Sequence, residues 1–176
     1  MNHTDHVNLL RGGVVTPGGV WADIGSGTGA FTLALAELLG QGGEIYSVDR
    51  DRGSLRTQAR QMQAQFPQTT IHYLTADFTQ PLDLPILDGI VVANALHFQR
   101  YAAQEQVVRQ LKSHLRSDGR LIVVEYNVDR GNHWVPYPLS YQSWVKLART
   151  CGFAHTQLLA ERSSRFLHAI YAAVSW

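Results

Sequence analysis

Cysteine and charged residues are both scarce in this sequence. Cys151 is the only cysteine, so no internal disulfide can form, which is typical of proteins in a reducing compartment. Charged residues make up 16% of the 176 residues, and the formal net charge is +1. This balance provides no positive field that would gather nucleic acid. We therefore expect no nucleic-acid partner, and we expect Cys151 to be a buried apolar residue rather than a nucleophile.

Long apolar runs and metal-binding clusters are also lacking. No apolar window approaches the length of about 20 residues that a membrane helix requires. Residues 1–10 contain no basic segment followed by an apolar one, so we expect no signal peptide, no membrane partner and a cytoplasmic location. His3 and His6 share one face of a candidate helix, but two histidines without a third ligand do not define a metal site. We therefore expect no bound metal.

What the sequence does contain is a regular alternation of predicted strands and helices. This alternation predicts a parallel sheet with right-handed crossovers. The last two strands are joined by so short a link, 161–165, that they can pair only antiparallel. The length suits one domain over 1–176, with a short helical segment at 1–19 and an aromatic loop at 127–144 on the substrate side. The periodicity predicts strands at 20–24, 44–49, 70–76, 86–94, 120–126, 153–160 and 166–174, and helices at 30–39, 51–66, 101–115 and 141–151.

A glycine-rich turn follows the first predicted strand. Gly25, Gly27 and Gly29 lack Cβ atoms, so the backbone can turn tightly and a ligand can approach closely. The exposed N–H groups at the start of the next helix would face that ligand. Ser26 lies within the turn, and Asp23 precedes it at the end of the strand, where an acid suits a ligand with a cationic end.

Two ligand classes fit this turn. The order Gly25-x-Gly27-x-x-Ala30 satisfies the fingerprint of dinucleotide sites, so an NAD(P)-binding oxidoreductase is one alternative. However, Asp23 would repel a pyrophosphate and attract an amino group. Asp49 ends the second strand 20 positions after Gly29, the interval at which a βαβ unit brings a carboxylate to ribose hydroxyls. Asp49 could instead cap the next helix, although Asp51 is better placed for that.

The acid-first order Asp23-x-Gly25-x-Gly27-x-Gly29 resembles the first motif of class I S-adenosylmethionine-dependent methyltransferases. The resemblance covers the chain from Val20 onward. It implies an α/β, Rossmann-like three-layer sandwich with a seven-stranded, mostly parallel sheet of order 3-2-1-4-5-7-6 and an antiparallel terminal strand. It also implies S-adenosyl-L-methionine as the cofactor and methyl transfer to a small molecule, within the EC 2.1.1 class.

The resemblance further implies where the cofactor is held. Asp77, after the third strand, would accept a hydrogen bond from the adenine amino group, and Phe78 would border the base. Considered without the family, Asp77 is equally well explained as a turn residue. Asn94, where the chain leaves the fourth strand, would face the methionine end. The expected cofactor-binding residues are Asp23, Gly25, Ser26, Gly27, Gly29, Asp49, Arg50, Asp77, Phe78 and Asn94.

His97 is the candidate catalytic residue. An unperturbed histidine pKa of about 6.5 suits removal of a proton from a hydroxyl or amine, although His97 could instead be a packing residue. His133, Tyr137 and Tyr141 are alternative proton acceptors in or beside the aromatic loop. That loop favours a flat or apolar acceptor, although its rings could equally serve to pack the loop onto the core. No Asn-Pro-Pro-Tyr motif follows the fourth strand, which disfavours the enzymes that methylate adenine or glutamine.

Little sequence remains to build a cover over the acceptor. This shortage keeps open a non-catalytic S-adenosylmethionine-binding module, or a site that a second subunit completes in a homodimer. The acceptor atom itself is not identified by any motif in the chain.

Overall fold

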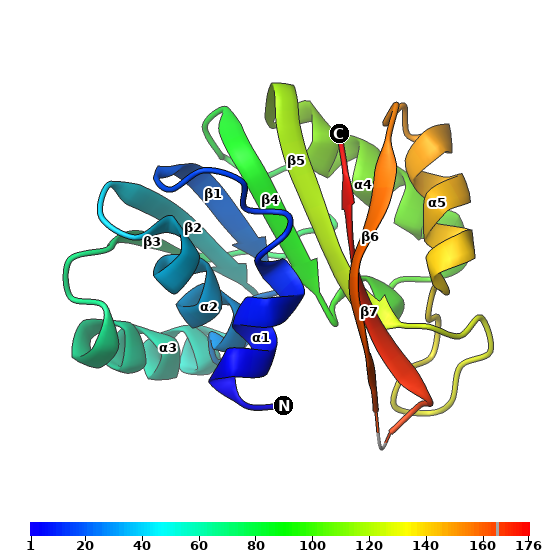
Figure 1. Cartoon of the computed structure of the whole chain (residues 1–176), viewed down its shortest axis with the longest axis horizontal. Helices are drawn as coiled ribbons and strands as arrows, with labels where there is room; N and C mark the ends of the chain where they lie inside the picture. Colours follow the sequence, from blue (N-terminus) through cyan, green and yellow to red (C-terminus); the bar gives the residue numbers. More distant parts are fainter. Residues whose placement is uncertain (165) are drawn as a thin grey trace.

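A seven-stranded sheet runs through the part of the chain that the structure describes, residues 1–164 and 166–176. The structure is a computed structural model, and Figure 1 shows its helices packed on both faces of the sheet. The strand order is β3-β2-β1-β4-β5-β7-β6, the order that the resemblance implies. The strands are β1 (Gly19–Ile24), β2 (Gly43–Asp49), β3 (Thr70–Thr75), β4 (Leu87–Ala93), β5 (Leu115–Tyr126), β6 (Thr156–Ser163) and β7 (Ala169–Ser175).

The pairing of the strands confirms the predicted mixed sheet. Strands β1 to β5 pair in parallel, whereas β7 pairs antiparallel with both β5 and β6. Both faces of the central strands are apolar, because Ile90 and Val92 of β4 face one core cluster and Val91 faces the other. Such strands are typical of a parallel sheet covered on both sides.

Helices cover the two faces of the sheet in separate groups. Helices α1 (His3–Leu10), α2 (Ala30–Leu39) and α3 (Arg52–Gln65) contribute apolar residues to one core cluster. Helices α4 (Tyr101–Ser113) and α5 (Tyr141–Thr150) contribute to the other. Because β1 to β5 are parallel, their carboxyl ends lie along one edge of the sheet, at the bottom of Figure 1, where the start of α1 also lies. Ligands of such sheets bind at this edge.

Two predicted strand starts differ from the structure. Strand β5 begins at Leu115 rather than at residue 120, because Leu115 pairs with Leu87 before the register shifts within 116–119. Strand β6 begins at Thr156 rather than at residue 153, because the Phe153 N–H still bonds the Ala148 carbonyl of the preceding helix.

Two further expectations are confirmed. The Asp51 side chain caps α3 by accepting hydrogen bonds from the N–H groups of Gly53 and Ser54. Cys151 is buried and free, as expected of a small apolar residue. Within residues 1–164 and 166–176, no helix has the length and apolar character needed to cross a bilayer.

Candidate active site

A cavity of about 450 Å³ lies where the parallel strands end. Its volume falls within the range of about 300–1,000 Å³ that is usual for small-molecule sites. Six of the ten predicted cofactor-binding residues line it, whereas Asp23, Ser26, Gly27 and Gly29 do not. The lining residues are Gly25, Asp49, Arg50, Ala76, Asp77, Phe78, Thr79, Asn94, Ala95, Phe98 and Gln99.

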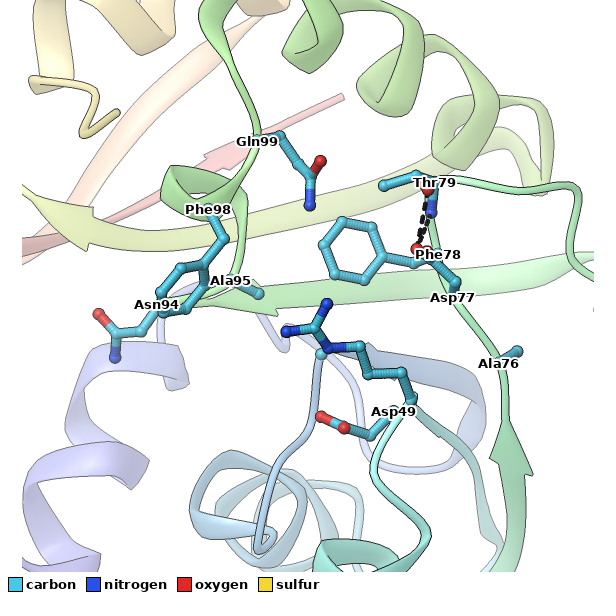
Figure 2. A pocket seen from close by; sticks show the side chains of 11 residues that line it. Asp49, Ala76, Asp77, Phe78, Thr79, Asn94, Ala95, Phe98 and Gln99 are labelled. Atoms are coloured by element: carbon cyan, nitrogen blue, oxygen red, sulfur yellow. Dashed lines mark hydrogen bonds between the residues drawn. The ribbon is translucent and has the colours of Figure 1, made fainter. Parts of the chain in front are cut away.

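Asp49 at the end of β2 is tied to the glycine-rich turn. Its Oδ2 accepts a hydrogen bond of 2.7 Å from the Gly27 N–H, and its Oδ1 accepts one of 2.8 Å from the Asp51 N–H. Each carboxylate oxygen has a second lone pair, so Asp49 can also accept bonds from a ligand in the cavity. Figure 2 shows the Asp49 carboxylate on the opposite side of the cavity from the Gln99 amide.

The glycine-rich turn packs too closely for side chains at two positions. A Cβ on Gly25 would lie 2.5 Å from the Cβ of Ala95, and a Cβ on Gly29 would lie 2.4 Å from Cγ of Gln58. Both residues also have positive φ values, +70° and +93°. Gly25 therefore lets the turn lie directly against the exit of β4, and Gly25 and Ala95 both line the cavity.

Asp23 is buried outside the cavity lining. It is 1% exposed, and its Oδ2 accepts a hydrogen bond of 2.5 Å from the Thr32 hydroxyl. Burial raises the pKa of Asp23 to about 7, and the negative charge of Asp49 adds to this effect. Asp49 and Asp77 thus line one cavity, while Asp23 contacts Thr32 rather than the open space.

Asp77 and Phe78 lie side by side after β3. Asp77 Oδ1 accepts hydrogen bonds from the Thr79 N–H at 2.9 Å and the Thr79 hydroxyl at 2.8 Å. These two bonds lower the pKa of Asp77, which is therefore an ionised acceptor at neutral pH. Asp77 is thus a turn residue that also lines the cavity. In Figure 2 the Phe78 ring projects into the cavity between Asp77 and Phe98.

Asn94 combines an unusual backbone conformation with an unpaired side-chain atom. Its φ of 51° is a left-handed conformation that few residues other than glycine adopt. Its Oδ1 is buried and has no hydrogen-bond partner within residues 1–164 and 166–176. A buried acceptor left unpaired costs about 1–3 kcal/mol, so a ligand with an N–H donor would be stabilised here.

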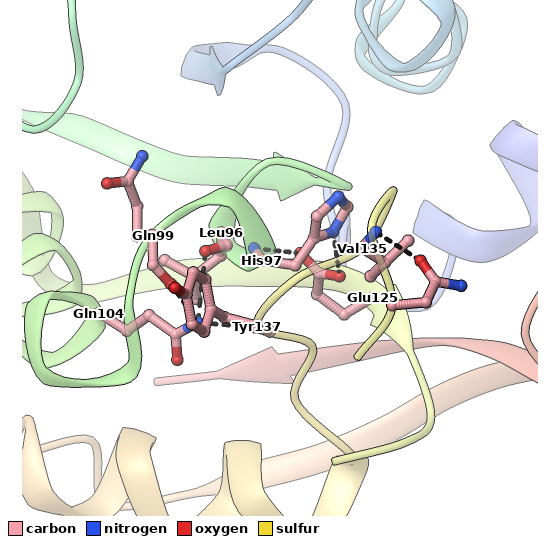
Figure 3. Close-up of polar contacts among 8 residues, drawn as sticks. Leu96, His97, Gln99, Gln104, Glu125, Val135 and Tyr137 are labelled. Carbon is pink, nitrogen blue, oxygen red and sulfur yellow. Dashed lines mark hydrogen bonds and ion pairs between the residues drawn. The ribbon is translucent and has the colours of Figure 1, made fainter. Parts of the chain in front are cut away.

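His97 is held by a buried glutamate. Its ring Nδ1 lies 2.8 Å from Oε2 of Glu125, and its backbone N–H donates to Oε1 at 3.1 Å (Figure 3). Glu125 is fully buried and His97 is 3% exposed. An Nδ1–H donated to the carboxylate leaves the Nε2 lone pair as the basic atom. His97 does not line the 450 Å³ cavity, but its neighbour Phe98 does, at a ring-centroid distance of 4.3 Å.

Glu125 was not among the predicted site residues. The signal that could have identified it is a single carboxylate in the otherwise apolar segment 121–126, where an unpaired charge would be costly. Because β4 and β5 are adjacent, the Glu125 carboxylate near the end of β5 lies beside the residues that follow β4, which include His97.

The short 3₁₀ turn that carries His97, η1 (Leu96–Phe98), is fixed from two sides. The buried Gln104 amide of α4 donates to the carbonyls of Leu96, Gln99 and Tyr137, at 3.3, 3.0 and 2.9 Å. The Tyr137 N–H in turn donates to the His97 carbonyl at 3.0 Å. Figure 3 shows this cluster beside the His97–Glu125 pair.

Replacing Gln104 by leucine should therefore loosen this turn. The variant keeps the side-chain size but leaves buried carbonyls without a donor, so we expect the free energy of unfolding to fall by about 1–3 kcal/mol. Urea denaturation would measure this, with Gln106→Leu as the control on the exposed face of the same helix. A loss no larger than that of the control would show that the amide does not hold the turn.

The predicted aromatic loop is only partly available to a ligand. Trp144 is buried in α5, and its indole N–H donates to the Ser175 hydroxyl at 3.2 Å. Trp134 is 68% exposed. The alternative proton acceptors His133, Tyr137 and Tyr141 do not line the 450 Å³ cavity. Within residues 1–164 and 166–176, no group of three His, Cys, Asp or Glu residues could hold a metal ion.

Comparison with known proteins gives a family and a fold. Residues 16–163 match a family whose description is "Methyltransferase domain". A 2-phytyl-1,4-naphtoquinone methyltransferase of Trichormus variabilis is 38% identical over 73 residues, which are 42% of this chain and 31% of that protein. The chain thus matches about a third of that relative's length.

Two solved structures share the fold at lower identity. Magnesium protoporphyrin IX methyltransferase of Synechocystis PCC 6803, solved with S-adenosylmethionine, has a TM-score of 0.71 at 22% identity, over 98% of this chain and 77% of that one. The 1,6-didemethyltoxoflavin-N1-methyltransferase of Burkholderia thailandensis, solved with 1,6-didemethyltoxoflavin and S-adenosylhomocysteine, has a TM-score of 0.73 at 21% identity, over 99% and 77%.

Proposed function

Since the chain belongs to the methyltransferase-domain family, we propose that it transfers a methyl group from S-adenosyl-L-methionine to a small-molecule acceptor. One observation carries this proposal: acidic residues from the ends of β2 and β3 and Asn94 from the exit of β4 line a single cavity. The naphtoquinone and toxoflavin named for the relatives support a small acceptor. A reducing, cytoplasmic location is part of the proposal and is supported by the one free cysteine.

The residues present fit this cofactor. Asp49 would accept the ribose hydroxyls and Asp77 the adenine amino group, with Phe78 against the base. The unpaired Oδ1 of Asn94 would accept an N–H of the methionine ammonium group. Asp23, when ionised, would attract the same ammonium group over a longer distance. Bound S-adenosyl-L-methionine would supply an electrophilic methyl group on a sulfonium.

His97 is proposed as the general base for an acceptor that must lose a proton. Its Nε2 would take the proton from an acceptor hydroxyl, while Glu125 holds Nδ1 and stabilises the positive charge that forms on the ring. Glu125 is a positioning residue, because it acts through His97. A buried base held in this way favours an enzyme over a non-catalytic cofactor-binding module.

Titration with S-adenosylhomocysteine tests the proposed cofactor. We expect saturable binding to the wild-type protein, as measured by calorimetry. Asp49→Asn should weaken it by about 10- to 100-fold, because hydrogen bonds to a charged group contribute about 1.5–3 kcal/mol. Asp83→Asn, at an exposed acid outside the cavity, is the control. If the wild type does not bind, or if Asp49→Asn binds as well as the control, the proposal is wrong.

A further inference from the structure

A second cavity, of about 430 Å³, opens on the same edge of the sheet. Tyr126 at the end of β5 and Ile170 of β7 contribute to it, together with Met1 and residues of the β6–β7 hairpin. In Figure 1, the start of α1 and the lower ends of β6 and β7 lie at this edge. The described lining residues are Met1, Tyr126, Arg162, Ser163, Ser164, Phe166 and Ile170, and they share no member with the first cavity.

A row of rings connects the two cavities. Phe98, which lines the first cavity, has its ring centroid 4.3 Å from that of His97. The centroid of the His97 ring lies 6.0 Å from that of Tyr126, and the centroid of Tyr126 lies 6.2 Å from that of Phe166. Tyr126 and Phe166 line the second cavity. His97 therefore lies next to one ring of each cavity, where a base would serve an acceptor bound in the second.

The walls of the second cavity combine aromatic and polar groups. Tyr126 and Phe166 offer ring faces to a planar ligand, and Phe166 is 54% exposed although it is apolar. Arg162 pairs with Asp5 through Nη1, while its Nε is buried and has no hydrogen-bond partner among residues 1–164 and 166–176. The Arg162 side chain is 39% exposed and lines the cavity, so its guanidinium would suit an oxygen acceptor on the ligand, such as a carbonyl or carboxylate.

Building on the proposed function, we propose that this second cavity binds the methyl acceptor, and that the acceptor is a hydroxyarene with a second oxygen group. The aromatic rings of Tyr126 and Phe166 hold its ring. Its hydroxyl faces His97, and its second oxygen group accepts from Arg162. The volume of about 430 Å³ accommodates a bicyclic aromatic compound.

Binding of 6-hydroxy-2-naphthoate, followed by its fluorescence in the presence of S-adenosylhomocysteine, tests this assignment. We expect Phe166→Ala to weaken binding about three- to tenfold, as loss of an aromatic contact would. Arg162→Gln should weaken binding of this probe about tenfold or more, but should barely change binding of 2-naphthol, which lacks the carboxylate. Trp134→Ala, at another exposed aromatic that lies outside the cavity, is the matched control and should bind normally.

Separate readouts distinguish this inference from the proposed function. Asp5→Asn removes the partner of Arg162 but keeps the guanidinium, so it should still bind the probe. If S-adenosylhomocysteine binds but the probe does not, or if Trp134→Ala weakens probe binding as much as Phe166→Ala, the acceptor site is assigned wrongly while the cofactor site stands. If the probe responds to the variants as expected but S-adenosylhomocysteine does not bind, the proposed function fails and the binding cavity stands.

Discussion

Replacing His97 by glutamine is expected to lower the rate of methyl transfer to a hydroxyl acceptor by about 100- to 10,000-fold. Glutamine can still donate to Glu125, but its amide cannot take up a proton near neutral pH. The variant should bind S-adenosylhomocysteine as the wild type does, since His97 does not line the cofactor cavity. Steady-state kinetics with saturating acceptor, together with calorimetry, would measure both quantities.

The chain offers a matched control for this variant. His72 pairs with Glu44 at 2.9 Å, but both side chains are partly exposed and lie on β3 and β2 rather than beside the site. His72→Gln should therefore leave the rate unchanged. Glu125→Gln should lower kcat with little change in KM, because it disturbs the base and not the acceptor contacts. Retention of full activity by His97→Gln would instead make His97 a packing residue.

Replacing Asp23 by asparagine is expected to change the pH dependence of stability. The folded-state pKa of Asp23 is about 7 against 3.8 for the ordinary group, so the folded protein holds a proton that the unfolded chain releases in this window. The wild type should therefore lose stability as pH rises from about 4 to above 7, by about 4 kcal/mol from this residue. Asp23→Asn should lack that loss, because its amide oxygen can still accept from Thr32 and carries no charge.

Urea denaturation between about pH 4 and pH 8 would measure this difference. Asp83→Asn, at an exposed acid, should follow the wild-type profile. Affinity for S-adenosylhomocysteine should rise with pH through about 7 in the wild type and stay flat in Asp23→Asn, because the ionised carboxylate attracts the ligand ammonium. Parallel stability profiles for Asp23→Asn and the wild type would contradict the assigned protonation.

The sequence predicts most of the fold because its signals are local. The glycine-rich turn, the cap at Asp51 and the short link between β6 and β7 each depend on residues near one another in the chain. The cavity lined by Asp49 and Asp77 follows from the same logic, since parallel strands end at one edge.

The remainder depends on contacts between distant residues. Glu125 and His97 are 28 positions apart, and their pairing requires η1 to fold back against the end of β5. The sequence likewise places an acid at the end of β1, but it does not show that Thr32 of α2 contacts Asp23. The start of β5 at Leu115 depends on pairing with Leu87, which periodicity alone does not register.

The two cavities draw on different parts of the chain. Residues 25–99 supply every described wall of the first cavity, whereas residues 126–170, apart from Met1, supply those of the second. Exchanging the C-terminal part between homologous proteins should therefore alter which compound is methylated and preserve the binding of S-adenosyl-L-methionine. The last three strands would then act as a replaceable specificity module beside a constant donor-binding half, with His97 next to both cavities.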